Sequence, residues 1–156
     1  MRNDKLTVRK LFATASMNFT HFATTDRTLA AGDTQELLHS LMFSQAALQL
    51  SSNQPVWDIL IPIYLGKRED RFDSAKLSAL LIQVKASSNP NSYLVLKRDY
   101  ESLFRLDNPI ITILVDPGGS KPGIVPVESF ASNVFAFSIP SQALAMPFTI
   151  ASRANA

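Results

Sequence analysis

The sequence predicts a single α/β domain, a mixed β-sheet flanked by helices. Its 156 residues match the usual size of one domain. Hydrophobic residues make up 46% of the chain and charged residues 18%, which is enough apolar material for a core and too little charge for general disorder. The apolar residues follow helical and strand spacings in turn, in the order helix, strand, strand, helix, strand, strand.

The first helix is predicted over residues 34–50. Asp33 can cap its start, and Glu36 lies three residues further on as the reciprocal partner of a capping box. Its apolar stripe recurs at helical spacing and consists of Leu37, Leu38, Leu41, Met42, Ala46 and Leu48. The polar run after Leu50, with Pro55, predicts where it ends.

Two strands are predicted next, over residues 57–65 and 77–85, joined by a charged, exposed loop. β-branched and aromatic residues favour the first strand, and Pro62 indicates either a sheet edge or the point where pairing stops. A second helix is predicted over residues 96–106. Residues 110–115 form a continuous β-branched run, as in a strand buried on both faces, and a last strand is predicted over residues 133–139.

These elements place a folded domain at residues 32–140. Residues 1–31 show no sustained period and are expected to be a partly irregular lead-in, with one short strand or helix at most. Residues 141–156 form an Ala-rich tail.

Composition excludes several function classes. The chain has no cysteine, so disulfides, thiol nucleophiles and Cys-ligated metals are out, and an intracellular location in cytoplasm or nucleus is expected. His21 and His39 are too few for a multi-His metal site. No run reaches about 18 apolar residues, so no membrane helix is expected. The net charge of +2 neither demands nor forbids a nucleic-acid partner.

A polar pair interrupts the apolar strand at residues 77–85. Gln83 and Lys85 are two apart and therefore share one face of the strand. Burying an amide or an ammonium without partners is costly, so a polar group should face them. If the two strands pair as a hairpin, Asp58 lies opposite this end of the second strand.

An acid, an amide and a lysine at one sheet end can perform metal-assisted phosphodiester hydrolysis. Asp58 and Gln83 would hold Mg²⁺ or Mn²⁺, which prefer oxygen ligands. The metal would polarise the phosphate and activate a water, and Lys85 would stabilise the developing charge. DNA or RNA is the expected substrate.

Asp58 followed by the strand Leu80-Leu81-Ile82-Gln83-Val84-Lys85 resembles the core motif of the PD-(D/E)xK phosphodiesterase superfamily. The segment from Asn53 to Pro62, taken with this strand, also resembles a group of uncharacterised fungal proteins. The resemblance covers about residues 37–115 and implies a restriction-endonuclease-like core of helix, three strands, helix and strand. That is one strand more than the pattern between the two helices predicts, and the lead-in or the region near Asn53 would supply it.

The resemblance assigns a role to each residue of the motif. Asp58 matches the metal-binding aspartate and Lys85 the catalytic lysine. Gln83 stands where the superfamily usually has Glu or Asp, as it does in Mrr-like restriction enzymes. Gln45 and Gln49, expected on one helical face, are the candidates for the supporting polar residue that active members often add from the first helix.

Other interpretations of the same residues remain open. The domain could be a catalytically inactive nuclease-fold module that binds or interacts, or a fragment of a larger protein. Asp58 could be a turn residue, Lys85 a strand-end lysine that protects a sheet edge, and Gln83 structural. The helix glutamines and the basic residues of the charged loop fit solvated surfaces; the loop residues are Lys67, Arg68 and Arg71.

Overall fold

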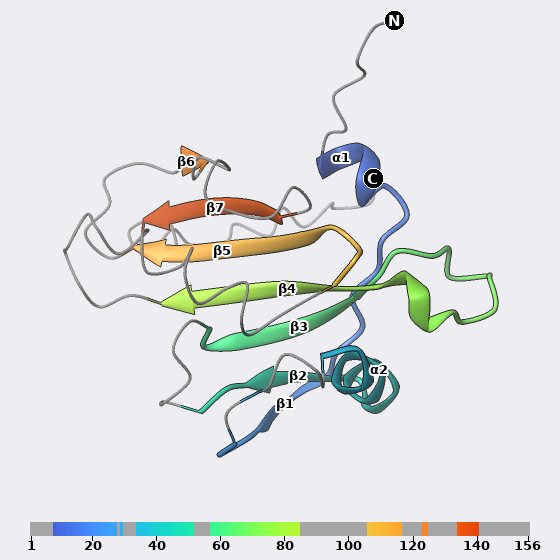
Figure 1. Ribbon diagram of the computed structural model, residues 1–156, viewed down its shortest axis with the longest axis horizontal. Helices are drawn as coiled ribbons and strands as arrows, with labels where there is room; N and C mark the ends of the chain where they lie inside the picture. The colour runs from blue at the N-terminus through green and yellow to red at the C-terminus, as the bar shows by residue number, and fades with distance from the viewer. Residues whose placement is uncertain are drawn as a thin grey trace, which may run out of the picture.

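The computed structural model describes residues 8–27, 29, 34–51, 57–84, 106–116, 123–124 and 134–140. In these residues, seven strands form one sheet in the spatial order β1-β2-β3-β4-β5-β7-β6 (Figure 1). The strands are β1 (His21–Thr24), β2 (Ala46–Gln49), β3 (Ile59–Tyr64), β4 (Leu77–Val84), β5 (Ile110–Asp116), β6 (Gly123–Ile124) and β7 (Val134–Pro140). The helices are α1 (Val8–Leu11), α2 (Thr34–Ser44) and the 3-10 helix η1 (Ser74–Lys76). The α/β class predicted from the sequence is thereby confirmed.

The sheet is mixed. β3 runs antiparallel to both of its neighbours, β2 and β4, whereas β1 is parallel to β2, and β5 is parallel to β4 and β7. The carboxyl ends of β1, β2, β4, β5 and β7 therefore lie at one edge, where β3 begins. Figure 1 shows the arrowheads of β4, β5 and β7 together at this edge, which is called the carboxyl edge below.

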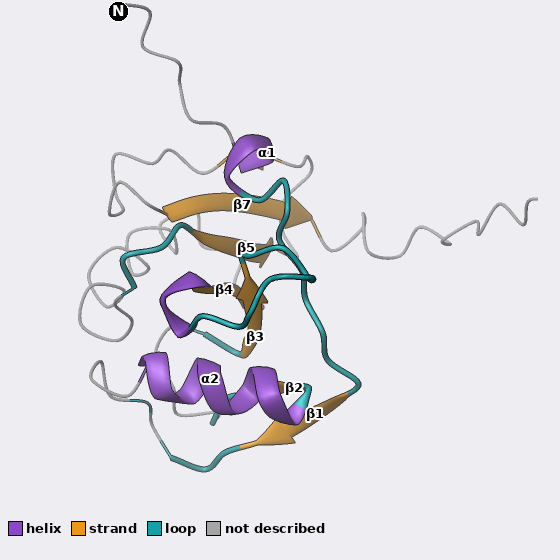
Figure 2. Cartoon of the chain, turned by 90° about the vertical axis from the view of Figure 1, so that its right-hand side faces the viewer, coloured by secondary structure: helices purple, strands orange, loops and turns teal. Residues whose placement is uncertain are grey.

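Helix α2 covers one face of the sheet (Figure 2). Its residues Leu38 and Leu41 are buried in one cluster with the alternate residues of β3 and β4, including Leu60 and Leu81. Successive strand residues point to opposite faces, so Ile59 and Ile82, which are register partners, belong to the other face. Near β7, the α1 end of the chain reaches the sheet through an edge-to-face contact between Phe12 and Phe135.

The helix predicted over residues 34–50 is confirmed over residues 34–44 and is wrong over residues 45–50. Helix α2 ends at Ser44, Gln45 adopts a positive φ of 54°, and Ala46–Gln49 form β2. A short apolar run has the same pattern in a helix and in a buried strand, and here the backbone turn at Gln45 decides between them. β2 is the additional strand between the first helix and β3.

The residues predicted as a lead-in contribute β1 at the side of the sheet. The strands predicted at residues 57–65, 77–85, 110–115 and 133–139 are confirmed as β3, β4, β5 and β7, within two residues at each boundary. Pro62 does not mark a sheet edge, because β3 lies between β2 and β4. Pairing of β3 with β2 covers only Ile59 and Leu60, so it stops before the proline. The predicted cap Asp33 and all but the last residue of the predicted helix 96–106 lie outside the described residues.

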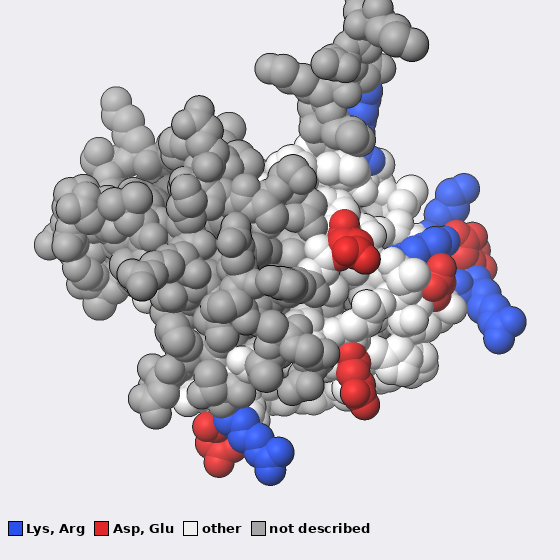
Figure 3. Space-filling model, in the orientation of Figure 1, with Lys and Arg blue, Asp and Glu red and all other residues white. Residues whose placement is uncertain are grey.

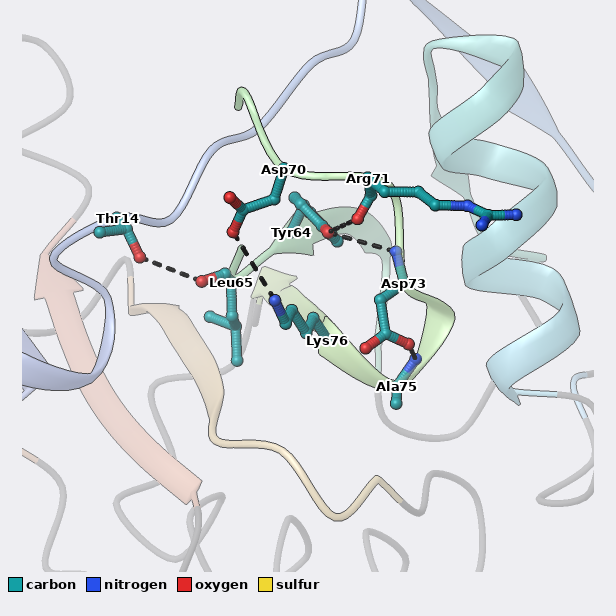
Figure 4. Close-up of polar contacts among 8 residues, drawn as sticks. All are labelled: Thr14, Tyr64, Leu65, Asp70, Arg71, Asp73, Ala75 and Lys76. Carbon is teal, nitrogen blue, oxygen red and sulfur yellow. Dashed lines mark hydrogen bonds and ion pairs between the residues drawn. The ribbon is translucent and has the colours of Figure 1, made fainter. Parts of the chain in front are cut away.

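The loop from Leu65 to Lys76 joins β3 and β4 at the end opposite the carboxyl edge (Figure 4). The Tyr64 hydroxyl donates to the Arg71 carbonyl at 3.3 Å and accepts from the Asp73 N–H at 3.2 Å. A Cβ at Gly66 would lie 2.5 Å from the Tyr64 ring, so glycine is required there. The loop is exposed, as predicted, but a tyrosine anchors it to the core.

None of the helices in the described part of the chain has the length and apolarity that a membrane span requires.

Candidate functional site

Asp58 lies at the carboxyl edge, immediately before β3. Its N–H donates to the Ile82 carbonyl at 2.9 Å, and its carbonyl accepts from the Leu50 N–H at 2.8 Å. Its carboxylate Oδ2 accepts from the Val84 N–H at 2.6 Å. Asp58 is therefore bonded to the two residues that flank Gln83. The hairpin predicted from the sequence places the acid beside Gln83 along the backbone.

Gln83 lies near the end of β4 and is only 5% exposed. It alternates with Leu81 and so lies on the face that α2 covers, level with Leu114 of β5. The side-chain oxygen Oε1 is buried and has no hydrogen-bond partner among the described residues. A buried polar atom left unsatisfied costs about 1–3 kcal/mol, so this oxygen calls for an explanation such as an ion or a water.

Lys85 lies outside the described residues, although it directly follows Val84, the last residue of β4. Asp116 was not predicted as a site residue, but it ends β5 at the same edge and pairs with Pro140. The signal in the sequence is an acid at the end of the most apolar strand.

The prediction that the two supporting glutamines share one helical face is wrong. Gln45 lies in the turn that ends α2, where its carbonyl accepts from the Thr20 N–H at 2.8 Å. Gln49 ends β2 and reaches the carboxyl edge. The two glutamines are therefore at opposite ends of an extended segment, since β2 follows Gln45 and ends at Gln49. Of the two, only Gln49 lies near Asp58.

Gln49 and Asp58 both line a pocket of about 450 Å³. Its other described lining residues are apolar: Phe22, Leu50 and Ile59. Register pairs Gln49 with Ile59 and Phe22 with Ala47, so Phe22, Gln49 and Ile59 belong to the face opposite α2. The edge therefore carries an open pocket beside Asp58, and the Gln83 amide is buried between the two β4 residues to which Asp58 is hydrogen-bonded.

The donor atoms at this edge suit a hard cation. The Asp58 carboxylate and the unsatisfied Gln83 oxygen are the ligand types that Mg²⁺ and Mn²⁺ prefer. Within the described residues, no three Asp, Glu or His side chains gather as a ready-made cage. Mg²⁺ is often held by one or two carboxylates with water and substrate phosphates, so the types of donor atom at this edge fit such a cation.

Charge on the described surface is dispersed. In Figure 3, Lys and Arg side chains alternate with Asp and Glu on the described part of the face in view, and no continuous basic patch forms there. In the loop between β3 and β4, for example, Lys76 pairs with Asp70 at 3.8 Å.

No family model matches the chain, and neither does any curated protein or solved structure.

Proposed function

We propose that this domain is a metal-dependent phosphodiesterase of the PD-(D/E)xK nuclease-like type, acting on nucleic acid. The observation that carries the proposal is the position of Asp58, which is hydrogen-bonded to both neighbours of a buried, unsatisfied Gln83. The order of helix α2, antiparallel strands β2-β3-β4 and parallel strand β5 supports it. The resemblance implies a core of helix, three strands, helix and strand. Helix α2 and strands β2, β3 and β4 correspond to its first four elements, and β5 corresponds to its last strand.

In this proposal each residue has a role that follows from its functional group. Asp58 and Gln83 would hold Mg²⁺ or Mn²⁺, which supplies Lewis acidity toward a phosphate and lowers the pKa of a bound water. The Val84 N–H fixes one carboxylate oxygen of Asp58 and leaves the other available to a ligand. Lys85 would offset the negative charge that develops on the phosphate during attack.

A second candidate is a catalytically inactive module of the same fold. It is favoured by the neutral amide at position 83, which is a weaker metal ligand than the usual carboxylate. It is also favoured by the dispersed surface charge, because phosphate contacts supply most of the affinity of nucleic-acid binders.

Purified full-length protein with Mn²⁺ and either plasmid or single-stranded DNA or RNA tests the proposal. Asp58→Asn keeps an oxygen that can accept from Val84 but removes the charge, and we expect it to lower cleavage about a hundredfold or more. Lys85→Ala should have a similar effect. The matched controls are Asp107→Asn and Lys67→Ala, because both side chains are exposed and belong to segments at the opposite end of the strands.

Three outcomes separate the candidates. Cleavage lost in both site variants and kept in both controls supports the phosphodiesterase. Cleavage that survives both Asp58→Ala and Lys85→Ala refutes the assignment. Calorimetric binding of Mn²⁺ that Asp58→Asn abolishes, without any cleavage by the wild type, identifies the inactive module.

A further inference from the structure

The pocket beside Asp58 combines features that recognise an unpaired nucleic-acid base. It has an exposed aromatic ring, an exposed amide and a carboxylate around an apolar floor, in a volume of about 450 Å³. Pockets for small organic groups have this composition, apolar walls with a few polar atoms that fix orientation. Bases are read in the same way, by stacking on an aromatic side chain and by hydrogen bonds along the base edge.

Phe22 provides the stacking surface. It lies on β1, is 53% exposed, and faces away from α2 because it pairs with Ala47 between positions that point to the core. The ring of Phe19 meets it edge-on, with centroids 5.7 Å apart and planes at 65°. This contact supports the Phe22 ring in place. The two neighbouring rings, Phe22 at 53% and Phe19 at 36% exposed, form an apolar patch beside polar groups, which is typical of a binding surface.

Gln49 and Asp58 provide the polar rim. A glutamine amide offers donors and an acceptor, and an ionised carboxylate offers acceptors only. Gln49 is exposed at the end of β2, and its register partner Ile59 directly follows Asp58. The amide and the carboxylate therefore approach the pocket from adjacent strands.

We propose that this pocket receives an unpaired base of single-stranded nucleic acid, stacked on Phe22. The proposal rests on the proposed phosphodiesterase function and gives its substrate class, because a base within a duplex is stacked on its neighbours and cannot enter. It also places the bound strand next to Asp58, the acid of the candidate site.

Fluorescence anisotropy with labelled oligonucleotides in EDTA tests the proposal. EDTA removes divalent metal, so binding is measured without cleavage. Three probes of matched sequence are required: single-stranded DNA, single-stranded RNA and duplex DNA. The wild type should bind at least one single strand more tightly than the duplex, and Phe22→Ala should weaken that binding about tenfold, within the range that stacking contributes per base.

Variants separate stacking from folding. Phe22→Trp keeps an aromatic plane and should retain single-strand affinity. Phe43→Ala removes another exposed ring, 65% exposed, from α2 on the other face, and should bind like the wild type. Gln49→Ala should weaken binding without disturbing the core, since this side chain is exposed.

The proposal is overturned if Phe22→Ala and Gln49→Ala bind single strands as the wild type does, or if the wild type prefers the duplex or binds neither. Its failure is distinguishable from failure of the proposed function. Normal cleavage with unchanged Phe22→Ala binding overturns the pocket alone, whereas Phe22-dependent binding without any cleavage in Mn²⁺ supports the pocket and removes the catalytic assignment.

Discussion

The two ends of the β3–β4 hairpin handle their polar groups in opposite ways. At the loop end, polar side chains find partners within the protein: the Tyr64 hydroxyl makes two hydrogen bonds, and Asp73 accepts from the Ala75 N–H at 3.0 Å to begin η1 (Figure 4). At the carboxyl edge, the Gln83 side-chain oxygen is buried without a partner among the described residues. One carboxylate oxygen of Asp58 accepts a hydrogen bond from the Val84 N–H.

Under the proposed function, one end of the hairpin serves the fold and the other end serves a ligand. A polar group that holds a loop finds its partner within the protein, because an unsatisfied buried group is destabilising. A buried oxygen without a protein partner is expected where a ligand supplies the partner. Variants at the two ends test this contrast.

Gln83→Glu should have the largest effect on stability. In EDTA, a carboxylate at this 5% exposed position has no bound cation to offset its charge, and we expect a loss of about 3 kcal/mol in the free energy of unfolding. Mn²⁺ at about a hundred times its Kd should raise the free energy of unfolding of this variant by about 2.7 kcal/mol.

Urea denaturation with and without Mn²⁺ measures both effects. Gln49→Glu is the matched control, since it makes the same change at an exposed position of the same edge and should lose little stability. A Gln83→Glu protein that Mn²⁺ does not stabilise would argue against a cation at this edge.

Asn108→Ala should have an intermediate effect, at the loop end. The amide Nδ2 donates to the carbonyls of Ala75 at 2.6 Å and Leu77 at 2.7 Å, so alanine leaves both acceptors without this donor. We expect a loss of about 2 kcal/mol in the free energy of unfolding. Urea denaturation measures it, and Mn²⁺ should leave the loss unchanged; a stability equal to that of the wild type would mean that water replaces the amide at no cost.

Gln83→Met should have the smallest effect. Methionine has a similar length and removes an unsatisfied oxygen, so stability in EDTA should stay within about 1 kcal/mol of the wild type or increase. In contrast, Mn²⁺ binding measured by calorimetry should weaken. A large loss of stability would show that the Gln83 amide is a structural group, like the polar groups of the loop end.

Some elements of the fold could be predicted from the sequence and others could not. Strand β5 was predictable because every residue over 110–115 except Leu114 is β-branched, and only Thr112 among them is polar. Strand β2 was not, because Ala46 and Leu48 continue the apolar spacing of α2. Only the left-handed turn at Gln45 and the two neighbouring strands distinguish strand from helix there.

In the candidate site, too, some residues could be predicted from the sequence and others could not. The position of Asp58 beside Gln83 follows from a hairpin whose length can be counted along the chain, so it was predicted. Gln49 was predicted on a helix but lies on β2, and Asp116 and Phe22 were not predicted as site residues. Each depends on which strands become neighbours in the sheet.

The amino-acid sequence by itself determined the α/β class, four of the strands and the pairing of Asp58 with the end of β4, because alternation and hairpin register are local properties of the chain. The tertiary structure decided the rest. It turned the end of a predicted helix into β2, buried the Gln83 amide near the end of β4, and put Phe22 and Gln49 beside Asp58. These outcomes depend on contacts between segments far apart in the chain, and no local pattern encodes them.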